Sequence, residues 1–220
     1  MTLLDFPGKI ACTVFLGGCN FRCPFCHNGS LAKGCGEALM SVDELLAFLD
    51  SRRGRLQGVC ISGGEPTLNP ELPDLIAEIK SRGFAVKLDT NGTNPQMLYG
   101  LIADGLVDYV AMDIKNSPDN YFSTIGVQSD EYMASVCESA ELLMSGKVDF
   151  EFRTTLVREL HTPYDIEKIG MWLSGNEKFF LQTYRDEGDL LVGGFTPFTK
   201  EEIIDLLDIL KKHIPNAKIR

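Results

Sequence analysis

The sequence lacks any apolar run close to the ~20 residues that a helix needs to cross a bilayer. Its first nine residues also lack the charged start and long apolar stretch of a secretory signal. Basic charge is scarce: 21 Lys and Arg stand against 31 Asp and Glu, which gives a formal net charge of -10. Such a chain repels a polyanion unless a local basic patch overrides the field. We therefore expect a cytoplasmic protein with neither a membrane nor nucleic acid as a partner.

Internal repeats, low-complexity segments and interdomain linkers are also absent from the 220 residues. A chain of this length suits one domain, because single α/β domains commonly run past 200 residues before they split. Hydrophobic residues make up 44% and charged residues 24%, close to the globular average, so most of the chain should fold around a core. We expect residues 1–220 to form a single domain.

Strand-like and helix-like segments alternate along the chain. Six apolar runs predict strands, and each is followed by a segment with helical apolar spacing. Strict alternation predicts an α/β fold with a parallel sheet covered by helices, and its chemistry should gather in the loops after the strands. Periodicity alone fits an open doubly wound sheet or an incomplete barrel equally well. The six runs are residues 10–16, 58–62, 84–90, 108–114, 149–157 and 179–184.

Three of the seven cysteines gather directly after the first predicted strand. Cys19, Cys23 and Cys26 form a C-x3-C-x2-C motif, with no fourth cysteine at matching spacing. Three thiolates on a cluster of four irons and four sulfurs leave one iron without a protein ligand, so that it can bind a small molecule. A zinc site that adds His27 is the alternative, although four ligands within nine residues would close poorly around one ion. We favour the iron–sulfur cluster.

This motif, with Phe25 before its last cysteine, resembles the signature of radical S-adenosylmethionine (radical SAM) enzymes. The resemblance implies that Cys19, Cys23 and Cys26 hold a [4Fe-4S] cluster, that Phe25 lies at the cofactor site, and that the cofactor is S-adenosyl-L-methionine. It also favours the incomplete barrel, a parallel-stranded partial (β/α)6 TIM-like barrel, because a partner loop could enter such a barrel from the side.

A glycine-rich turn follows the second predicted strand. Gly63 and Gly64 would let backbone carbonyls approach a ligand's ammonium group, although the same residues could form a simple tight turn. Together with Glu65 and Pro66 they resemble the GGEP element of radical SAM enzymes. That resemblance implies that Gly63, Gly64 and Glu65 hold the amino group of the cofactor's methionine.

Charged residues end the third and fourth predicted strands. Asp89 and Thr90 end one strand, and Asp113 and Lys115 the next; the two acids and the lysine could hold a cation and a carboxylate together, or the acids could simply cap helices. They resemble the DTNG and D-x-K elements of glycyl-radical-enzyme activases, which implies contacts to S-adenosylmethionine and a possible monovalent cation. Arg153 on the fifth strand could reach the cofactor, or could pair with a nearby acid.

Several polar residues and cysteines outside these motifs have no assigned role. His161, Gln182, Tyr184 and Arg185 are candidates for the substrate side, and Cys35 lies in a glycine-rich loop with no role that the sequence defines. Three further cysteines stand in apolar contexts and are expected to be small core residues. They are Cys12, Cys60 and Cys137.

Two N-terminal motifs narrow the resemblance. Residues 3–8 (LLDFPG) and the Cys26-His27-Asn28 extension are similar to the activating proteins of glycyl radical enzymes, and particularly of anaerobic ribonucleoside-triphosphate reductase. Phe6 stands where many of those proteins have glycine. The implied function is reductive cleavage of S-adenosylmethionine, with flavodoxin or ferredoxin as electron donor, and formation of a glycyl radical on a partner enzyme.

Two other functions fit part of the sequence. One is a radical SAM enzyme that acts on a small heterocycle, of the 7-carboxy-7-deazaguanine synthase type, although the N-terminal motifs argue against it. The other is an electron-transfer or metal-binding module without turnover. Such a module has no need for the GGEP or DTNG elements and usually closes its cluster with a fourth cysteine.

Overall fold

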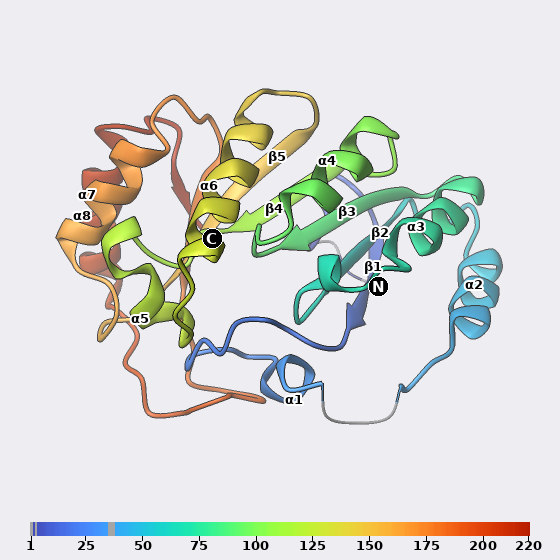
Figure 1. The fold of residues 1–220 in the computed structure, drawn as a ribbon, viewed down its shortest axis with the longest axis horizontal. Coiled ribbons are helices and arrows are strands. Elements are labelled where there is room, and N and C mark those ends of the chain that lie inside the picture. Colours follow the sequence, from blue (N-terminus) through green and yellow to red (C-terminus); the bar gives the residue numbers. More distant parts are fainter. Residues whose placement is uncertain (1, 3, 35–37) are drawn as a thin grey trace.

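The structure is a computed structural model that describes residues 2, 4–34 and 38–220. Seven strands form one fully parallel sheet in which each strand pairs with the next one along the chain (Figure 1). The strands are β1 (Ala11–Leu16), β2 (Gly58–Gly63), β3 (Ala85–Thr90), β4 (Tyr109–Asp113), β5 (Asp149–Leu156), β6 (Phe179–Thr183) and β7 (Lys218–Ile219).

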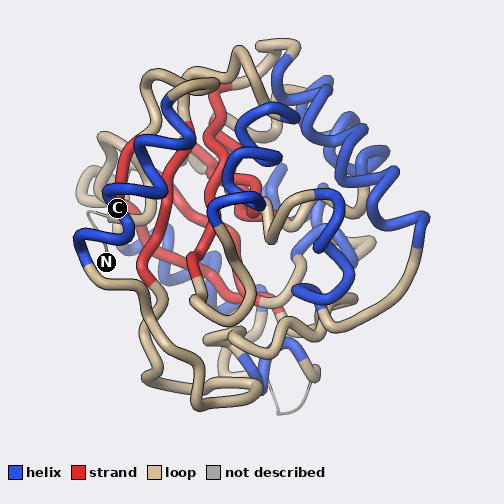
Figure 2. Tube along the Cα trace, turned by 90° about the vertical axis from the view of Figure 1, so that its left-hand side faces the viewer, coloured by secondary structure: helices blue, strands red, loops and turns tan. Residues whose placement is uncertain are grey.

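Helices connect the strands and lie around the curved sheet, whose strands run through the middle of the molecule (Figure 2). Capping boxes start α2, α7 and α8, where the side chains of Ser41, Thr162 and Thr199 accept from the helical backbone. The helices are α1 (Gly29–Ala32), α2 (Val42–Ser51), α3 (Leu72–Ser81), α4 (Pro95–Ala103), α5 (Tyr121–Ile125), α6 (Asp130–Met144), α7 (Pro163–Trp172) and α8 (Lys200–Lys211), with the short 3₁₀ turns η1 (Pro66–Leu68) and η2 (Pro118–Asn120).

The strand order decides between the two predicted architectures. A doubly wound sheet reverses its strand order at one point, whereas this sheet runs from β1 to β7 without reversal, as in a TIM barrel. Within the described ranges no ladder joins β1 to β7, so the barrel is incomplete. The partial TIM-like barrel is therefore confirmed, with one correction: β7 is a seventh strand. Two exposed residues carry too little pattern to predict it.

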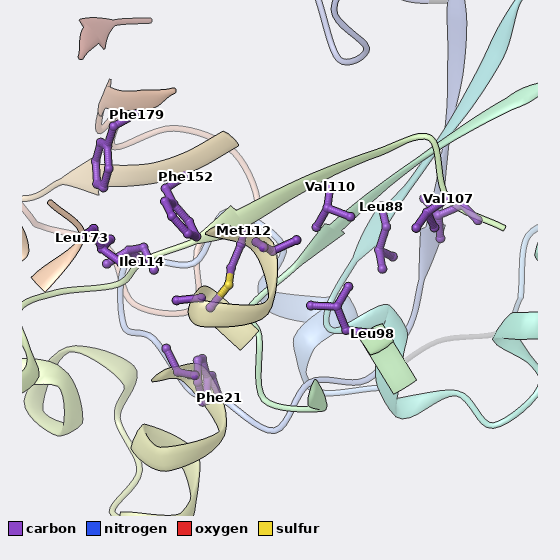
Figure 3. Close-up of a cluster of buried hydrophobic side chains, with 14 of the residues drawn as sticks. Phe21, Leu88, Leu98, Val107, Val110, Met112, Ile114, Phe152, Leu173 and Phe179 are labelled. Atoms are coloured by element: carbon purple, nitrogen blue, oxygen red, sulfur yellow. The ribbon is translucent and has the colours of Figure 1, made fainter. Parts of the chain in front are cut away.

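Successive side chains along each strand point alternately toward the surrounding helices and toward the barrel interior. Val110, Met112 and Ile114 follow one another at every second position, are fully buried, and point to the same side of β4 (Figure 3). Burying side chains of this size contributes roughly 1.5–3 kcal/mol each. Tyr109, Ala111 and Asp113 alternate with them and face the interior, where Tyr109 and Asp113 contact Glu151 and Arg153 of β5.

Candidate active site

The three predicted cysteines lie together at the C-terminal ends of the strands. Cys19, Cys23 and Cys26 line one cavity of about 180 Å³, in the loop that leaves β1. Cys26 N donates to Cys23 O at 3.0 Å and so closes a turn between these two residues. Phe25 lines the same cavity and is 5% exposed, so its ring shields this side from water.

Burial holds two of these thiols in the protonated form while no metal is bound. It raises the pKa of Cys19, and it raises the pKa of Cys23 to about 12. An iron cluster would replace those protons and supply the positive charge that a buried thiolate needs. Within the described ranges, no group of three or more His, Cys, Asp or Glu side chains is spaced to hold a single metal ion. Three thiolates in one cavity are nevertheless the ligands that iron–sulfur clusters take, so the chemistry of the donor set fits such a cluster.

The glycine turn after β2 packs directly against the cysteine loop. A Cβ atom on Gly63 would lie 2.1 Å from Leu16 O, and one on Gly64 would lie 2.0 Å from Gly18 O. Gly63 also has φ +124°, which a side chain would disfavour. Both glycines line the cavity. Their missing side chains thus bring the turn and the cysteine loop into backbone contact.

The carboxylate of Glu65 forms hydrogen bonds within the protein. The side chain is 1% exposed and accepts hydrogen bonds from Thr67 N and Oγ1, from Thr90 Oγ1 at 2.7 Å and from Asn91 N at 2.6 Å. Burial raises the pKa of Glu65. The predicted neighbours Glu65 and Thr90 are therefore in contact, and Glu65 ties the turn after β2 to the end of β3. Thr90 lines the cavity, whereas Glu65 does not.

The predicted charged residues form a continuous row across β3, β4 and β5. Arg153 lies between two carboxylates, with Nη1 3.3 Å from Asp89 Oδ2 and Nη2 2.9 Å from Asp113 Oδ1. Lys115 Nζ lies 3.0 Å from Asp113 Oδ2. Lys87, which is 1% exposed, pairs with Asp89 at the other end of the row. We call these five residues the upper charged layer; sequence reasoning missed only Lys87.

The upper charged layer carries more positive than negative charge. Burial alone would raise the pKa of Asp113, but Arg153 and Lys115 outweigh it and lower that pKa to about 2. Burial alone would lower the pKa of Lys115, yet Asp113 raises it above its usual value. The layer thus contains three cations and two carboxylates, and of these five groups Asp89, Asp113 and Lys115 line the cavity.

Asn91 is a cavity residue that the sequence interpretation did not single out, although it follows Thr90 in the DTNG element. It is 4% exposed, and its Nδ2 donates to Asn20 Oδ1 at 2.9 Å and lies 4.0 Å from Cys19 Sγ. Its Oδ1 accepts from Thr93 N at 3.0 Å. Asn91 therefore couples the end of β3 to the first cysteine.

Two of the substrate-side candidates are buried and hydrogen-bonded within the protein. His161 is 1% exposed, and its ring bonds to Lys115 O at 2.8 Å and to Val157; burial lowers its pKa. Tyr184 is also 1% exposed and donates to Asp186 Oδ1 at 2.7 Å. Gln182 lies within β6 and is half-buried, and Cys35 falls outside the described residues.

The fold and the site define a class: an incomplete parallel barrel with a three-thiol cavity at the C-terminal ends of its strands. The Radical SAM superfamily matches residues 13–145, more than half of the chain. The chain therefore belongs to the radical SAM superfamily, as the cysteine motif predicted. A [4Fe-4S] cluster and S-adenosylmethionine are the cofactors that this family implies.

Relatives of known name support an enzyme. The chain is 34% identical over its whole length to a Methanocaldococcus jannaschii protein that carries the name "Putative glycyl-radical enzyme activating enzyme", of which it covers 92%. It is 35% identical to the pyruvate formate-lyase-activating enzyme of Clostridium pasteurianum, over 57% of this chain and 53% of that one. It is 31% identical to the 7-carboxy-7-deazaguanine synthase of Neisseria meningitidis serogroup B, over 61% of each chain.

A solved structure shares the fold at low identity. SuiB of Streptococcus suis, solved with bound S-adenosylmethionine, aligns with 98% of this chain at a TM-score of 0.73 and 14% identity. This chain covers 50% of SuiB, so the likeness concerns one part of that larger protein. In the part of the chain that the structure describes, no helix is both long enough and apolar enough to span a bilayer.

Proposed function

We propose that this protein is a glycyl-radical enzyme activating enzyme, acting as a single domain over residues 1–220. It cleaves S-adenosylmethionine reductively and generates a radical on a glycine of a partner enzyme. The observation that carries the proposal is the cavity in which three cysteines lie beside a layer of surplus positive charge. Similarity over the full length to the Methanocaldococcus jannaschii protein that carries that name supports the class.

The partner and the electron donor are finer parts of the proposal. We expect an anaerobic ribonucleoside-triphosphate reductase as the partner, and flavodoxin or ferredoxin as the donor. The residue 5–8 motif (DFPG) and the Cys26-His27-Asn28 motif support this choice. The incomplete barrel supports it as well: no ladder joins β1 to β7 in the described residues, and a peptide loop of the partner would enter at that edge.

Three thiols of the cavity would hold the [4Fe-4S] cluster: those of Cys19, Cys23 and Cys26. When bound, the cluster supplies the electron that breaks a carbon–sulfur bond of S-adenosylmethionine, and the cofactor supplies the radical. Cys23 and Phe25 are 6% and 5% exposed, so the protein keeps water away from this side of the site. The chain's contribution is to position the reactants and to exclude solvent.

The upper charged layer is suited to the charged methionine end of S-adenosylmethionine. Its net positive charge would compensate a carboxylate, and its acids Asp89 and Asp113 lie beside the cavity for an ammonium group. Arg153 and Lys115 would hold these acids in place through their ion pairs. Thr90, Gly63 and Gly64 complete this wall, and Glu65 positions it through Thr90.

A monovalent cation would have to share carboxylates that already have partners. Asp89 is paired with Lys87 and Arg153, and Asp113 with Arg153 and Lys115, through all four oxygens. We therefore expect no more than about a twofold change in S-adenosylmethionine cleavage when potassium is replaced by choline. A larger dependence on potassium would support the cation site.

Anaerobic reconstitution tests the proposal. Reduced, reconstituted protein should convert S-adenosylmethionine to 5'-deoxyadenosine, and addition of the reductase encoded in the same genome should give a glycyl-radical signal in electron paramagnetic resonance. Cys23→Ala should abolish both results. Cys137→Ala, which changes a half-buried cysteine on α6, should leave them intact. Cleavage without a glycyl radical on any glycyl radical enzyme of that genome would reject the activating function.

A second function has a specific observation in its favour. The similarity to 7-carboxy-7-deazaguanine synthase extends over 61% of the chain. If that function were correct, the reconstituted protein would form 7-carboxy-7-deazaguanine from its precursor, which chromatography detects, and no protein radical would appear. The two functions therefore give opposite results in the same preparation.

A further inference from the structure

A late segment of the chain crosses the cysteine loop from the far side of the barrel. We call residues 185–196, which follow β6, the strap; its orange trace passes beside α1 in Figure 1. Leu191 N donates to Cys26 O at 3.0 Å, and Val192 N donates to Pro24 O at 2.9 Å. The strap backbone thus binds the backbone of the third cysteine itself.

The carboxylate of Asp189 adds side-chain contacts to the same loop. Its Oδ2 accepts from Ser30 N at 2.8 Å, and its Oδ1 accepts from Ser30 Oγ at 3.1 Å. Its backbone oxygen accepts from Gly29 N at 2.8 Å. Asp189 therefore holds the residues that lead from Cys26 into α1.

Close packing at Gly29 shows how tightly the two segments fit. A Cβ atom on Gly29 would lie 2.9 Å from Leu191 N and 3.0 Å from Asp189 O. Both neighbours are backbone atoms, which cannot turn aside as a flexible side chain could. A single added methyl group at this position would push the strap away from the cysteine loop.

The base of the strap is fixed to the barrel. The Asp186 carboxylate accepts a hydrogen bond from Gly194 N at 3.1 Å and another from the Tyr184 hydroxyl. These bonds join the beginning of the strap to its end. Thr196 N donates to the carboxylate of Glu159 at 3.0 Å, just beyond the end of β5. With both ends held, the middle of the strap is presented to the cysteine loop in a defined position.

The first half of the cysteine loop depends on other elements. Glu65 N donates to Gly18 O at 2.8 Å just before Cys19, and Arg22 N donates to Ile125 O at 2.8 Å just before Cys23. These contacts come from the β2 turn and from α5. The strap contacts lie at Pro24 and beyond, so the strap holds the third cysteine and the other elements hold the first two.

We propose that the strap positions Cys26 relative to Cys19 and Cys23, with Asp189 as its main positioning residue. The proposal rests on the proposed role of these three cysteines as cluster ligands. Its physical basis is that a cluster needs three thiols at fixed mutual positions. Besides the turn to Cys23, the segment after Cys26 is tied to the β2 turn by Asn28 Nδ2, which donates to Gly63 O at 3.0 Å, but the strap makes the hydrogen bonds at Cys26 O and Pro24 O. The strap thus adds a constraint at the third cysteine from the other end of the chain.

Alkylation of the metal-free protein tests this proposal without any enzyme assay. The rate of iodoacetamide reaction is measured separately at Cys19, Cys23 and Cys26 by mass spectrometry. Asp189→Ala should raise the rate at Cys26 roughly fivefold, the size expected from the loss of about one net hydrogen bond, and leave the other two rates unchanged. Asp189→Asn should restore the wild-type rate, because the amide oxygen can still accept from Ser30 N.

Gly29→Ala disturbs the same contact from the cysteine loop, because the added methyl group would collide with the strap backbone. This variant should also raise the alkylation rate at Cys26 alone. The matched controls are Gly17→Ala, where a Cβ meets no atom within 4 Å, and Glu187→Ala, which removes an exposed charge of the strap. Both controls should react like the wild type. An equal rise at all three cysteines, or no rise at Cys26 in either variant, would overturn the proposal. Because no cofactor is present, this result is independent of whether the loaded enzyme cleaves S-adenosylmethionine.

Discussion

The barrel interior contains a second charged layer, below the upper one and built on the same strands. Glu151 on β5 is fully buried and accepts from the Tyr109 hydroxyl at 2.9 Å on β4. Arg220 gives its carboxylate two further hydrogen bonds, of 2.6 and 3.0 Å. We call Tyr109, Glu151 and Arg220 the lower charged layer. One carboxylate here meets one guanidinium, so the charges cancel.

The two charged layers differ in their relation to the cysteine cavity. Glu151 and Arg153 lie two residues apart on β5 and therefore face the same interior, yet their surroundings differ. The lower layer is balanced and lines no described cavity with the cysteines, whereas the upper layer has surplus positive charge beside that cavity. The lower ion pair stabilises the fold through contacts within the protein. The Asp113 and Lys115 side chains of the upper layer are 31% and 21% exposed and line the cavity, so they can contact a ligand there.

The largest expected effect is on the upper layer. Asp113→Asn removes the carboxylate that Arg153 and Lys115 share, so both cations lose their fixed positions. S-adenosylmethionine cleavage should fall about 100-fold or more, as when a charged group is removed from a preorganised site. Formation of 5'-deoxyadenosine measures it. The control is Asp104→Asn at the end of α4, an exposed acid, which should retain full activity; full activity of Asp113→Asn as well would mean that the layer does not bind the cofactor.

The next effect concerns stability in the lower layer. Arg220→Ala leaves the fully buried Glu151 carboxylate without its cation, which should lower the free energy of unfolding by about 2–3 kcal/mol; the figure is below that of a wholly buried pair because Arg220 is 37% exposed. Urea unfolding measures this loss. Cleavage activity of the folded variant should stay within about twofold of wild type. Arg220→Lys should lose less stability, and Glu151→Gln combined with Arg220→Ala should recover part of the loss.

Much of the fold, and the gathering of the predicted site residues at one place, could be predicted from the pattern of apolar residues in the sequence. The six longer strands are apolar runs of suitable length, and parallel strands bring their C-terminal ends to one edge of the sheet. For that reason the sequence correctly placed Cys19, Gly63, Asp89 and Asp113 near one another. Lys87 was missed because a lysine inside a strand is usually expected at the surface, and only the ion pair with Asp89 explains its burial.

Contacts between distant loops could not be predicted from the sequence. Asp189 and Ser30 are 159 positions apart, and both belong to segments without apolar periodicity, so no local pattern relates them. The same limit applies to Glu65, whose hydrogen bonds to Thr90 and Asn91 depend on how two turns meet. Their geometry depends on tertiary packing, which the spacing of residue types does not encode.

A smaller effect should appear in the pH dependence of stability. The pKa of Asp113 is about 2 in the folded protein, against ~3.9 in an unfolded chain. Its ionised carboxylate therefore stabilises the fold above about pH 4, and this contribution is lost as the pH falls toward 2. The stability difference between wild type and Asp113→Asn should be about 2 kcal/mol at pH 6 and should shrink in urea unfolding at pH 3. A difference that stays constant with pH would show that Asp113 is not held by its cations.

The smallest expected effect is the loss of stability when the neutral hydrogen-bond donor of the lower layer is removed. Tyr109→Phe removes the hydroxyl that donates to Glu151 but leaves both hydrogen bonds from Arg220. The loss in urea unfolding should be about 1 kcal/mol, the net value of one hydrogen bond, with no change in cleavage. Tyr99→Phe on α4, at a residue that is 56% exposed, is the matched control and should be neutral. A loss above about 3 kcal/mol for Tyr109→Phe would mean that the hydroxyl, and not the guanidinium, holds Glu151, because a balanced ion pair tolerates the loss of a neutral donor.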